Sequence, residues 1–197
     1  MKVQERLINY VTVRTPSNEE SETVPSSMCQ FDLARKLEKE MQELGLTEVV
    51  LDDKCYLYGK LPATEGKENI PAIGFIAHMD TVSDFCDHEI HPIITENYDG
   101  GELTLGTSGL ILNPKEFPHL AELKGRTLIT SDGTTILGAD DKAGIAEILT
   151  MIERIQTEKL PHGTICVAFT PDEEIGMGAE HFDLEQFGAE YAYTLDG

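Results

Sequence analysis

His78 and Asp80 are the first residues of the chain whose types and spacing could do chemistry. They follow a short apolar run, residues 72–77, of the kind that forms a strand buried on both faces. Residues two apart on a strand point to the same side, so an imidazole and a carboxylate emerge together where the strand ends. Such a histidine can bind a metal ion through one ring nitrogen while the carboxylate holds the other nitrogen. For these two residues alone, a loop histidine beside a helix-capping aspartate is the simpler explanation.

Three further acidic clusters stand at an expected helix start or directly after an expected strand: residues 138–144, 171–176 and 195–197. Each cluster has an ordinary explanation when it is taken singly. Asp140 or Asp141 can cap a helix, and Asp196 can belong to a hairpin turn. Glu173 and Glu174 can form a solvated turn. Because short motifs often match by chance, each ordinary explanation outweighs a functional one by itself.

Taken together, the clusters favour a metal site. The carboxyl ends of parallel strands meet at one edge of a sheet, which would bring together His78, Asp80, Asp140, Glu173, Glu174 and Asp196. So many carboxylates would repel and raise one another's pKa values, and a divalent cation relieves that repulsion. One imidazole with several carboxylates suits zinc, and also cobalt or manganese. A bridging aspartate fits a pair of ions about 3.5–4 Å apart, as in two-metal hydrolytic sites.

The elements that must position these residues alternate between helical and strand patterns. This alternation predicts an α/β fold, with a largely parallel mixed sheet and helices on both faces. Helices are expected over residues 4–13, from Ser26 or Ser27 to Gly45, over residues 141–157 and over residues 182–187. Strands are expected over residues 48–52, 55–61, 73–77, 164–170 and 191–195.

The middle of the chain shows weaker patterns. Residues 93–112 predict short strands broken by glycine turns, and residues 113–124, with two prolines, predict an irregular segment. Residues 127–130 and 135–137 are expected to pair across the turn that lies between them.

Composition excludes some classes of partner. The chain of 197 residues has 15 basic and 36 acidic residues, a net charge of −21, which argues against nucleic acid and against anionic membranes. No apolar signal sequence follows Met1, and no stretch is long and apolar enough to span a bilayer. The four cysteines lack Cys-x-x-Cys spacing, which is typical of free thiols: Cys29, Cys55, Cys86 and Cys166. We therefore expect a cytoplasmic protein.

The four motifs resemble those of the M20 metallopeptidases, and within that family the aminopeptidases that cleave tripeptides. The matching segments follow in order along the chain: residues 78–81, 138–144, 170–176 and 193–197. The resemblance covers essentially the whole chain. It implies that residues 1–197 form the amino-terminal part of a zinc-exopeptidase-like catalytic domain. The dimerisation domain and the carboxyl-terminal part of the catalytic domain would lie outside these residues.

The resemblance also implies a set of metal ligands. His78 and Asp196 would bind one zinc ion, Asp140 would bridge two zinc ions, and Glu174 would bind the second. The peptide bond between Asp140 and Asp141 would be cis. No other histidine lies in a matching motif, so the second ion's histidine ligand is expected outside residues 1–197. The chain alone should then have little or no activity.

Two catalytic roles follow from the same resemblance. Asp80 would orient His78, and Glu173 would act as the general base that takes a proton from metal-activated water. The substrate would be a small peptide, hydrolysed at its amino-terminal peptide bond, and the full-length protein would be a homodimer.

Two alternatives stay open on the sequence. One is a related M20 dipeptidase, carboxypeptidase or deacylase, since these enzymes share the metal chemistry. The other is a non-catalytic metal-binding homologue. Glu173 argues against the second alternative, because a protein that only holds metal needs no free base beside its ligands.

Overall fold

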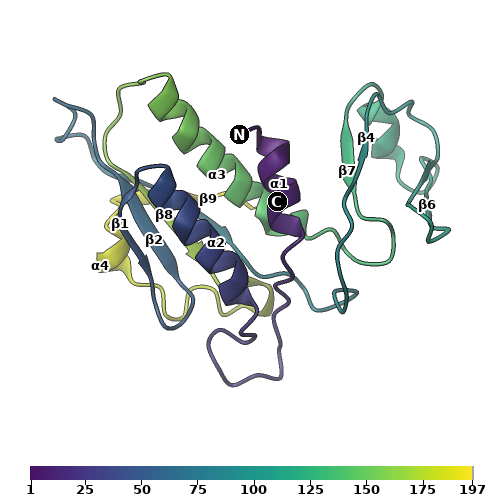
Figure 1. Cartoon of the computed structure of the whole chain (residues 1–197), viewed down its shortest axis with the longest axis horizontal. Coiled ribbons are helices and arrows are strands. Elements are labelled where there is room, and N and C mark those ends of the chain that lie inside the picture. Colours follow the sequence, from purple (N-terminus) through teal and green to yellow (C-terminus); the bar gives the residue numbers. More distant parts are fainter. Residues whose placement is uncertain (197) are drawn as a thin grey trace. The chain divides into compact units, whose positions relative to one another are not determined.

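The computed structural model describes residues 1–196, and Gly197 lies outside the described residues. The chain forms two compact units (Figure 1). The larger unit consists of Met1–Ser83 with Gly138–Gly197, and the smaller unit is Asp84–Leu137. The predicted site residues all belong to the larger unit.

A five-stranded sheet is the centre of the larger unit, in the order β1-β2-β8-β3-β9. Its strands are β1 (Thr47–Leu51), β2 (Leu57–Leu61), β8 (Ile165–Thr170), β3 (Ile73–His78) and β9 (Tyr191–Thr194). β8, β3 and β9 run parallel, whereas β1 pairs with β2 and β2 with β8 in the antiparallel sense. The prediction of a mixed α/β sheet is confirmed, with the parallel strands grouped on one side of β2.

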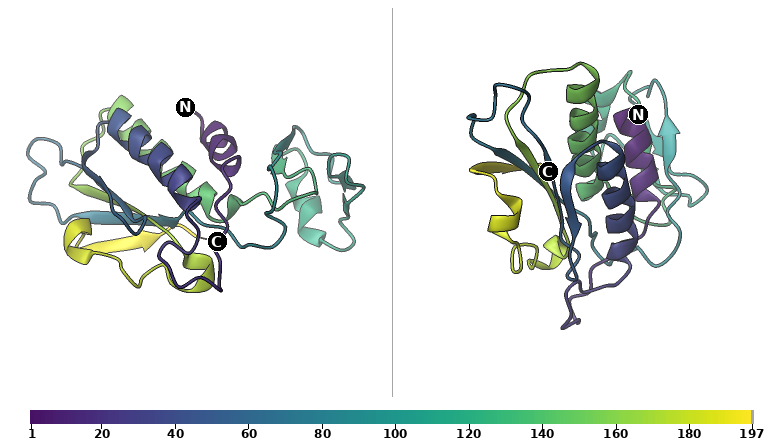
Figure 2. Two further views of the ribbon diagram at one scale, coloured as in Figure 1. Left: turned by 60° about the horizontal axis from the view of Figure 1, so that its bottom comes forward. Right: turned by 60° about the vertical axis from the view of Figure 1, so that its left-hand side comes forward.

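Helices cover both faces of this sheet. α2 (Gln30–Glu43) and α3 (Ala139–Thr157) pack on one face, and α1 (Val3–Val11) packs against α3. The short α4 (Leu184–Phe187) packs on the opposite face (Figure 2, right). Among residues 1–196, no helix combines the length and the low polarity that crossing a membrane requires.

The burial of β8 explains why its sequence is apolar from Ile165 to Phe169, before the final Thr170. All six of its residues are buried. Ile165, Val167 and Phe169 join the core beneath α2 and α3, while Cys166 and Ala168 join the core beneath α4. Because successive side chains of a strand point to opposite faces, a strand covered on both sides needs apolar residues at every position.

The start of α2 differs from the prediction. Its apolar residues lie on the expected helical stripe, and Gly45 follows its end with a φ of +75°. However, the helix begins at Gln30 with Cys29 in the capping position, and neither Ser26 nor Ser27 caps it. The Ser26 hydroxyl instead donates to the carboxylate of Asp172, 146 residues away. The other predicted helices and strands of the larger unit differ only at their ends.

The smaller unit has two short antiparallel pairs. β4 (Ile93–Thr95) pairs with β7 (Leu128–Thr130), and β5 (Leu103–Thr104) pairs with β6 (Ile111–Leu112). The expected pairing of residues 127–130 with 135–137 is wrong, because β7 takes β4 as its partner and residues 135–137 form no strand. Bonds from backbone amides to Ser131 and Asp132 side chains fold the intervening segment into a local turn. The segment expected to be irregular contains a 3₁₀ helix, η1 (Pro118–Leu123).

Candidate metal centre

The three parallel strands end at the same edge of the sheet. In register, His78 of β3 lies beside Thr170 of β8, and Ile76 of β3 lies beside Thr194 of β9. Each strand is followed within a few residues by a predicted site residue. The convergence expected from the sequence is therefore present, and it depends on the parallel pairing.

Asp140 reaches the same edge from the first turn of α3. The peptide bond between Asp140 and Asp141 is cis, as expected, and neither residue has helical backbone angles. Gly144 packs against the end of β9, where an added Cβ would collide with the carbonyl oxygen of Leu195 and with Oδ1 of Asp141. The start of α3 and the segment after β9 are thus held in close contact.

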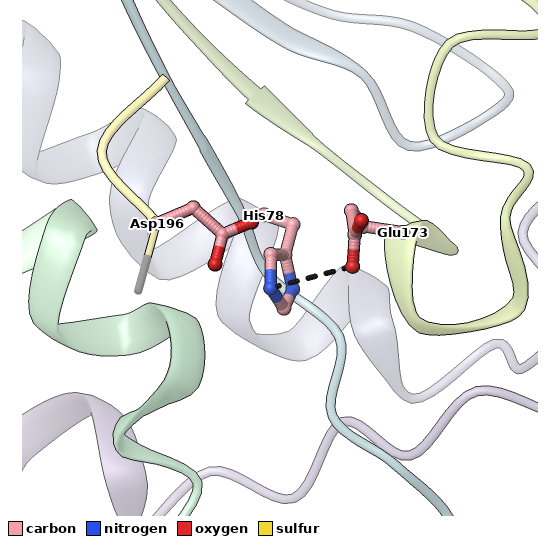
Figure 3. A group of neighbouring side chains, drawn as sticks. All are labelled: His78, Glu173 and Asp196. Atoms are coloured by element: carbon pink, nitrogen blue, oxygen red, sulfur yellow. Dashed lines mark ion pairs between the residues drawn. The ribbon is translucent and has the colours of Figure 1, made fainter.

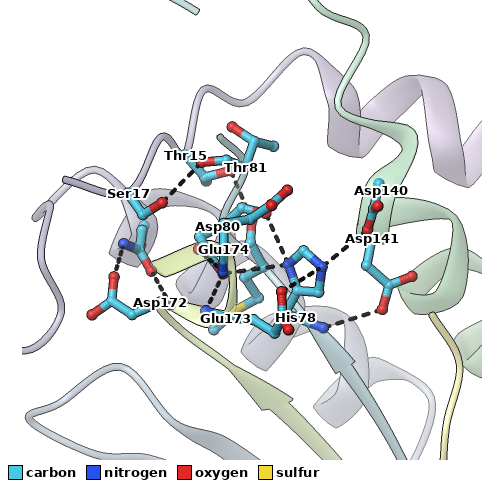
Figure 4. Close-up of polar contacts among 12 residues, drawn as sticks. Thr15, Ser17, His78, Asp80, Thr81, Asp140, Asp141, Asp172, Glu173 and Glu174 are labelled. Atoms are coloured by element: carbon cyan, nitrogen blue, oxygen red, sulfur yellow. Dashed lines mark hydrogen bonds and ion pairs between the residues drawn. The ribbon is translucent and has the colours of Figure 1, made fainter. Parts of the chain in front are cut away.

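His78 makes different contacts at its two ring nitrogens. The ring is 2% exposed. Nδ1 lies 3.0 Å from the carbonyl oxygen of Asp80 and 3.3 Å from its Oδ1. Nε2 lies 3.0 Å from Oδ1 of Asp140 and 3.7 Å from Oε2 of Glu173 (Figure 4). Both acceptors at Nδ1 favour a proton on that nitrogen, which leaves Nε2, facing the carboxylates, as the nitrogen that would bind a metal ion.

The surroundings of His78 favour a positive charge. Burial by itself lowers the pKa of the ring, but the hydrogen bond and the charge of Asp80, helped by Asp141 and Glu173, outweigh burial and raise the pKa to about 9. The same carboxylates would favour a bound cation at Nε2 for the same electrostatic reason.

Asp80 connects the histidine to the turn that carries the two glutamates. Its side chain is fully buried, and its carboxylate oxygens accept hydrogen bonds from the backbone amides of Glu173, at 3.0 Å, and Glu174, at 3.1 Å. This turn, η2 (Glu173–Ile175), begins three residues after the end of β8 at Thr170. Asp80 therefore contacts His78, as expected, and also fixes the backbone of two further site residues.

Two groups of side chains could hold a metal ion, and they share His78. In one, donor atoms of His78, Glu173 and Asp196 lie within 4.8 Å of one another (Figure 3). In the other, the donors are His78, Asp140 and Glu174, within the same distance. The structure therefore brings together all six predicted residues, counting Asp80 through its contacts with His78 and the turn. Imidazole and carboxylate donors of this kind fit zinc, cobalt and manganese.

The carboxylates of the centre differ in their environments. Burial raises the pKa of Glu174, as do the charges of Asp140, Asp80 and Glu173, against the opposing charge of His78. The side chains of Asp140 and Glu173 are 57% and 49% exposed, so both can reach a ligand from solvent. Crowded acids with a raised pKa are typical of sites that bind a cation.

Two buried aspartates beside the centre make contacts that the sequence did not indicate. Asp141 accepts hydrogen bonds from the backbone amides of His78 and Gly144, and its burial raises its pKa to about 7. Asp172 accepts hydrogen bonds from Ser26 and Gln30. Each aspartate stands in an acidic motif, but no local pattern indicates which acid of a motif turns inward.

A cavity lies beside the donor atoms. Its volume is about 680 Å³, and its wall combines Glu173 and Asp196 with the aromatic side chains of Phe182, Phe187 and Tyr191. The centre thus adjoins a space large enough for a small ligand, lined by both polar and apolar groups.

Known proteins resemble this chain in sequence. A model of the peptidase family M20/M25/M40 matches residues 132–195. Peptidase T of Desulfitobacterium hafniense (strain Y51) is 55% identical over 197 residues, 99% of this chain and 48% of that protein. Peptidase T of Geobacillus thermodenitrificans (strain NG80-2) is 53% identical over 98% of this chain and 47% of that protein. The chain therefore spans about half the length of the curated relatives it matches.

Solved structures give the same result. Aminopeptidase PepT from Bacillus cereus ATCC 10987 superposes with a TM-score of 0.68 and 33% identity, over 98% of this chain and 43% of that one. A tripeptidase from Staphylococcus aureus superposes with a TM-score of 0.65 and 29% identity, over 100% of this chain and 44% of that one. By sequence and by fold, the chain is a homologue of peptidase T over about half of that protein's length, and residues 132–195 match the M20 family.

Proposed function

We propose that this chain forms the amino-terminal part of the catalytic domain of a metal-dependent aminopeptidase. The full-length enzyme would hydrolyse the amino-terminal peptide bond of tripeptides. The observation that carries this proposal is the pair of donor groups around His78 at the edge of the sheet. The relatives named peptidase T and tripeptidase support the choice of substrate.

The ligand roles in this proposal follow the family resemblance, and each proposed ligand belongs to at least one of the two donor groups. His78 and Asp196 would hold one zinc ion, Glu174 would hold a second, and Asp140 would be a ligand of both. Zinc bound there would acidify a water molecule and polarise the carbonyl of the bond to be cleaved.

Glu173 is the proposed general base. Its carboxylate is half exposed, lies 3.7 Å from Nε2 of His78 and lines the cavity beside the donor atoms. A carboxylate in this position can take a proton from water and pass it to the leaving amine, provided that it does not itself ligate the metal. Asp80 keeps Glu173 in place through the backbone amide and holds His78 through Nδ1.

We further propose that residues 1–197 alone have little or no peptidase activity. Both donor groups rely on the same histidine, and the relatives are about twice as long as this chain. The histidine ligand of the second ion would come from the remainder, which would also supply a dimerisation domain. We also propose a cytoplasmic location, in keeping with a cysteine spacing that is typical of free thiols.

A hydrolysis assay with a substrate panel tests the function. The full-length protein should cleave tripeptides from the amino end, a chelator should abolish the cleavage, and zinc should restore it. Residues 1–197 alone should be nearly inactive. Preference for dipeptides or N-acyl amino acids would instead indicate another M20 activity. Metal uptake by the full-length protein without cleavage of any substrate would indicate a non-catalytic homologue.

A further inference from the structure

The turn that carries Glu173 and Glu174 begins at Asp172, an aspartate with an unusual setting. Asp172 is 1% exposed, and its φ of 56° lies in the left-handed region, which residues other than glycine seldom adopt. Its carboxylate makes no contact with the donor atoms around His78. It faces Ser26, which precedes α2, and Gln30, the first residue of α2.

The contacts of Asp172 form a two-way pairing with Gln30. Nε2 of Gln30 donates to Oδ1 of Asp172 at 2.6 Å, and the backbone amide of Asp172 donates to Oε1 of Gln30 at 3.3 Å. Ser26 adds two donors, its backbone amide to Oδ2 at 2.7 Å and its hydroxyl to Oδ1 at 2.5 Å. Gln30 is fully buried and Ser26 is 7% exposed. Three donors therefore surround a buried carboxylate.

The turn is held at a second point by Asp80, which accepts the amides of Glu173 and Glu174. One attachment fixes the residue before the two glutamates, and the other fixes the glutamates themselves. We propose that Ser26, Gln30 and Asp172, the Asp172 clasp, are positioning residues that set the direction of Glu173 and Glu174. Their role in catalysis rests on the function proposed above, whereas their effect on the turn does not.

The donor and acceptor pattern of the clasp allows a rescue experiment. In Asp172→Asn, an amide N–H₂ group faces a donor group of Gln30 or Ser26. In Gln30→Glu, a second carboxylate lies beside the carboxylate of Asp172. Either change leaves a buried group without a correct partner. In Asp172→Asn/Gln30→Glu the pattern is reversed. The amide at position 172 then donates to the carboxylate at position 30, which also accepts the backbone amide of residue 172.

Hydrogen exchange at the amides of Glu173 and Glu174 in the full-length protein tests the clasp without any metal. In each single variant, the exchange rate of these amides should rise roughly tenfold to hundredfold, because a hydrogen bond to a charged group is disrupted. The double variant should return toward the wild-type rate. Tyr10→Phe is the matched control, since it removes a 2.6 Å hydrogen bond to Glu40 elsewhere in the larger unit. It should lower stability and leave exchange at Glu173 and Glu174 unchanged.

A cobalt titration then connects the clasp to the metal centre. Each single variant should bind Co²⁺ about 10–100-fold more weakly, as expected when a partner that orients ligands is lost, and the double variant should recover. If the wild-type protein bound no Co²⁺, the proposed function would be contradicted. The hydrogen-exchange rates would still test whether the clasp holds the turn. If both single variants exchange the amides of Glu173 and Glu174 at the wild-type rate, or if the double variant does not return toward that rate, the proposed role of the clasp is wrong. If the single variants do not fold, Ser26→Ala replaces them, since it removes only one hydroxyl donor to Asp172. Unchanged exchange at Glu173 and Glu174 in that variant would also contradict the clasp.

Discussion

At the scale of residues, Glu173 and Glu174 illustrate how neighbouring acids acquire different environments. Asp80 accepts both of their backbone amides, so the two residues share one support. Glu173 lines the cavity with a half-exposed side chain, whereas burial raises the pKa of Glu174. The exposed acid suits proton transfer, and the less exposed acid suits a metal ligand.

Glu173→Gln should separate these roles. In the full-length protein we expect kcat to fall about 10²–10⁴-fold, since the amide cannot take up a proton. Metal content, measured by elemental analysis, should stay close to that of the wild type. The control is Glu185→Gln, at an exposed position of α4, which should leave kcat unchanged. Wild-type turnover by Glu173→Gln would contradict the assignment of the general base.

Asp80→Asn should weaken both attachments of this residue. One carboxylate oxygen becomes an N–H₂ group that faces a backbone donor, which should lower the free energy of unfolding by about 1–3 kcal/mol. Metal affinity should fall about 10–100-fold, because His78 and the turn lose a shared partner. Urea denaturation and a competitive chelator titration measure the two effects. Asp53→Asn, at an exposed position, should change neither, and an unperturbed Asp80→Asn would show that the buried carboxylate is dispensable.

At the scale of elements, α3 and the segment after β9 pack so closely at Gly144 that no side chain fits between them. Gly144→Ala should displace one from the other, because the added methyl group would meet the Leu195 carbonyl and the Asp141 carboxylate. Overpacking of this kind costs about 1–3 kcal/mol, against about 1 kcal/mol gained from the better helix propensity of alanine.

We therefore expect Gly144→Ala to lower metal affinity together with stability, as measured by zinc titration and thermal unfolding. Glu147→Ala, an exposed change one turn further along α3, serves as the control and should leave both quantities nearly unchanged. An increase in stability with intact metal binding would mean that the helix start is free to move, and would contradict the contact.

At the scale of the whole molecule, the acidic centre belongs to a chain with a net charge of −21. Such a field concentrates cations around the protein, and the donor groups then select where a cation binds. Because a ligand that binds only the folded state stabilises it, metal binding should be visible in the unfolding transition.

Zinc at a free concentration of 100 times its Kd should raise the free energy of unfolding of the full-length protein by about 2.7 kcal/mol, and a chelator should reverse the effect. His78→Ala should abolish the stabilisation, since both donor groups include this residue. His88→Ala removes an exposed histidine of the smaller unit and should preserve it. Equal stabilisation of wild type and His78→Ala would place the zinc site elsewhere.

Local patterns in the sequence determined the elements and the acids of the centre. A largely apolar run such as residues 164–170 indicates a buried strand directly, because each side chain must match the face of the sheet on which it lies. The parallel order that follows from alternating helices and strands was enough to bring His78 and the acidic clusters to one edge. The cis peptide bond between Asp140 and Asp141 was expected from the family resemblance, and it is present in the structure.

Only the tertiary structure decided which partner each polar group takes. β7 pairs with β4, and Ser26 binds Asp172 where the sequence predicts a helix cap. Both choices join residues far apart in the chain, and hydrogen-bonding capacity is the same for a near partner as for a distant one. Periodicity reports whether a side chain is buried, whereas the identity of its partner depends on which distant segment packs beside it.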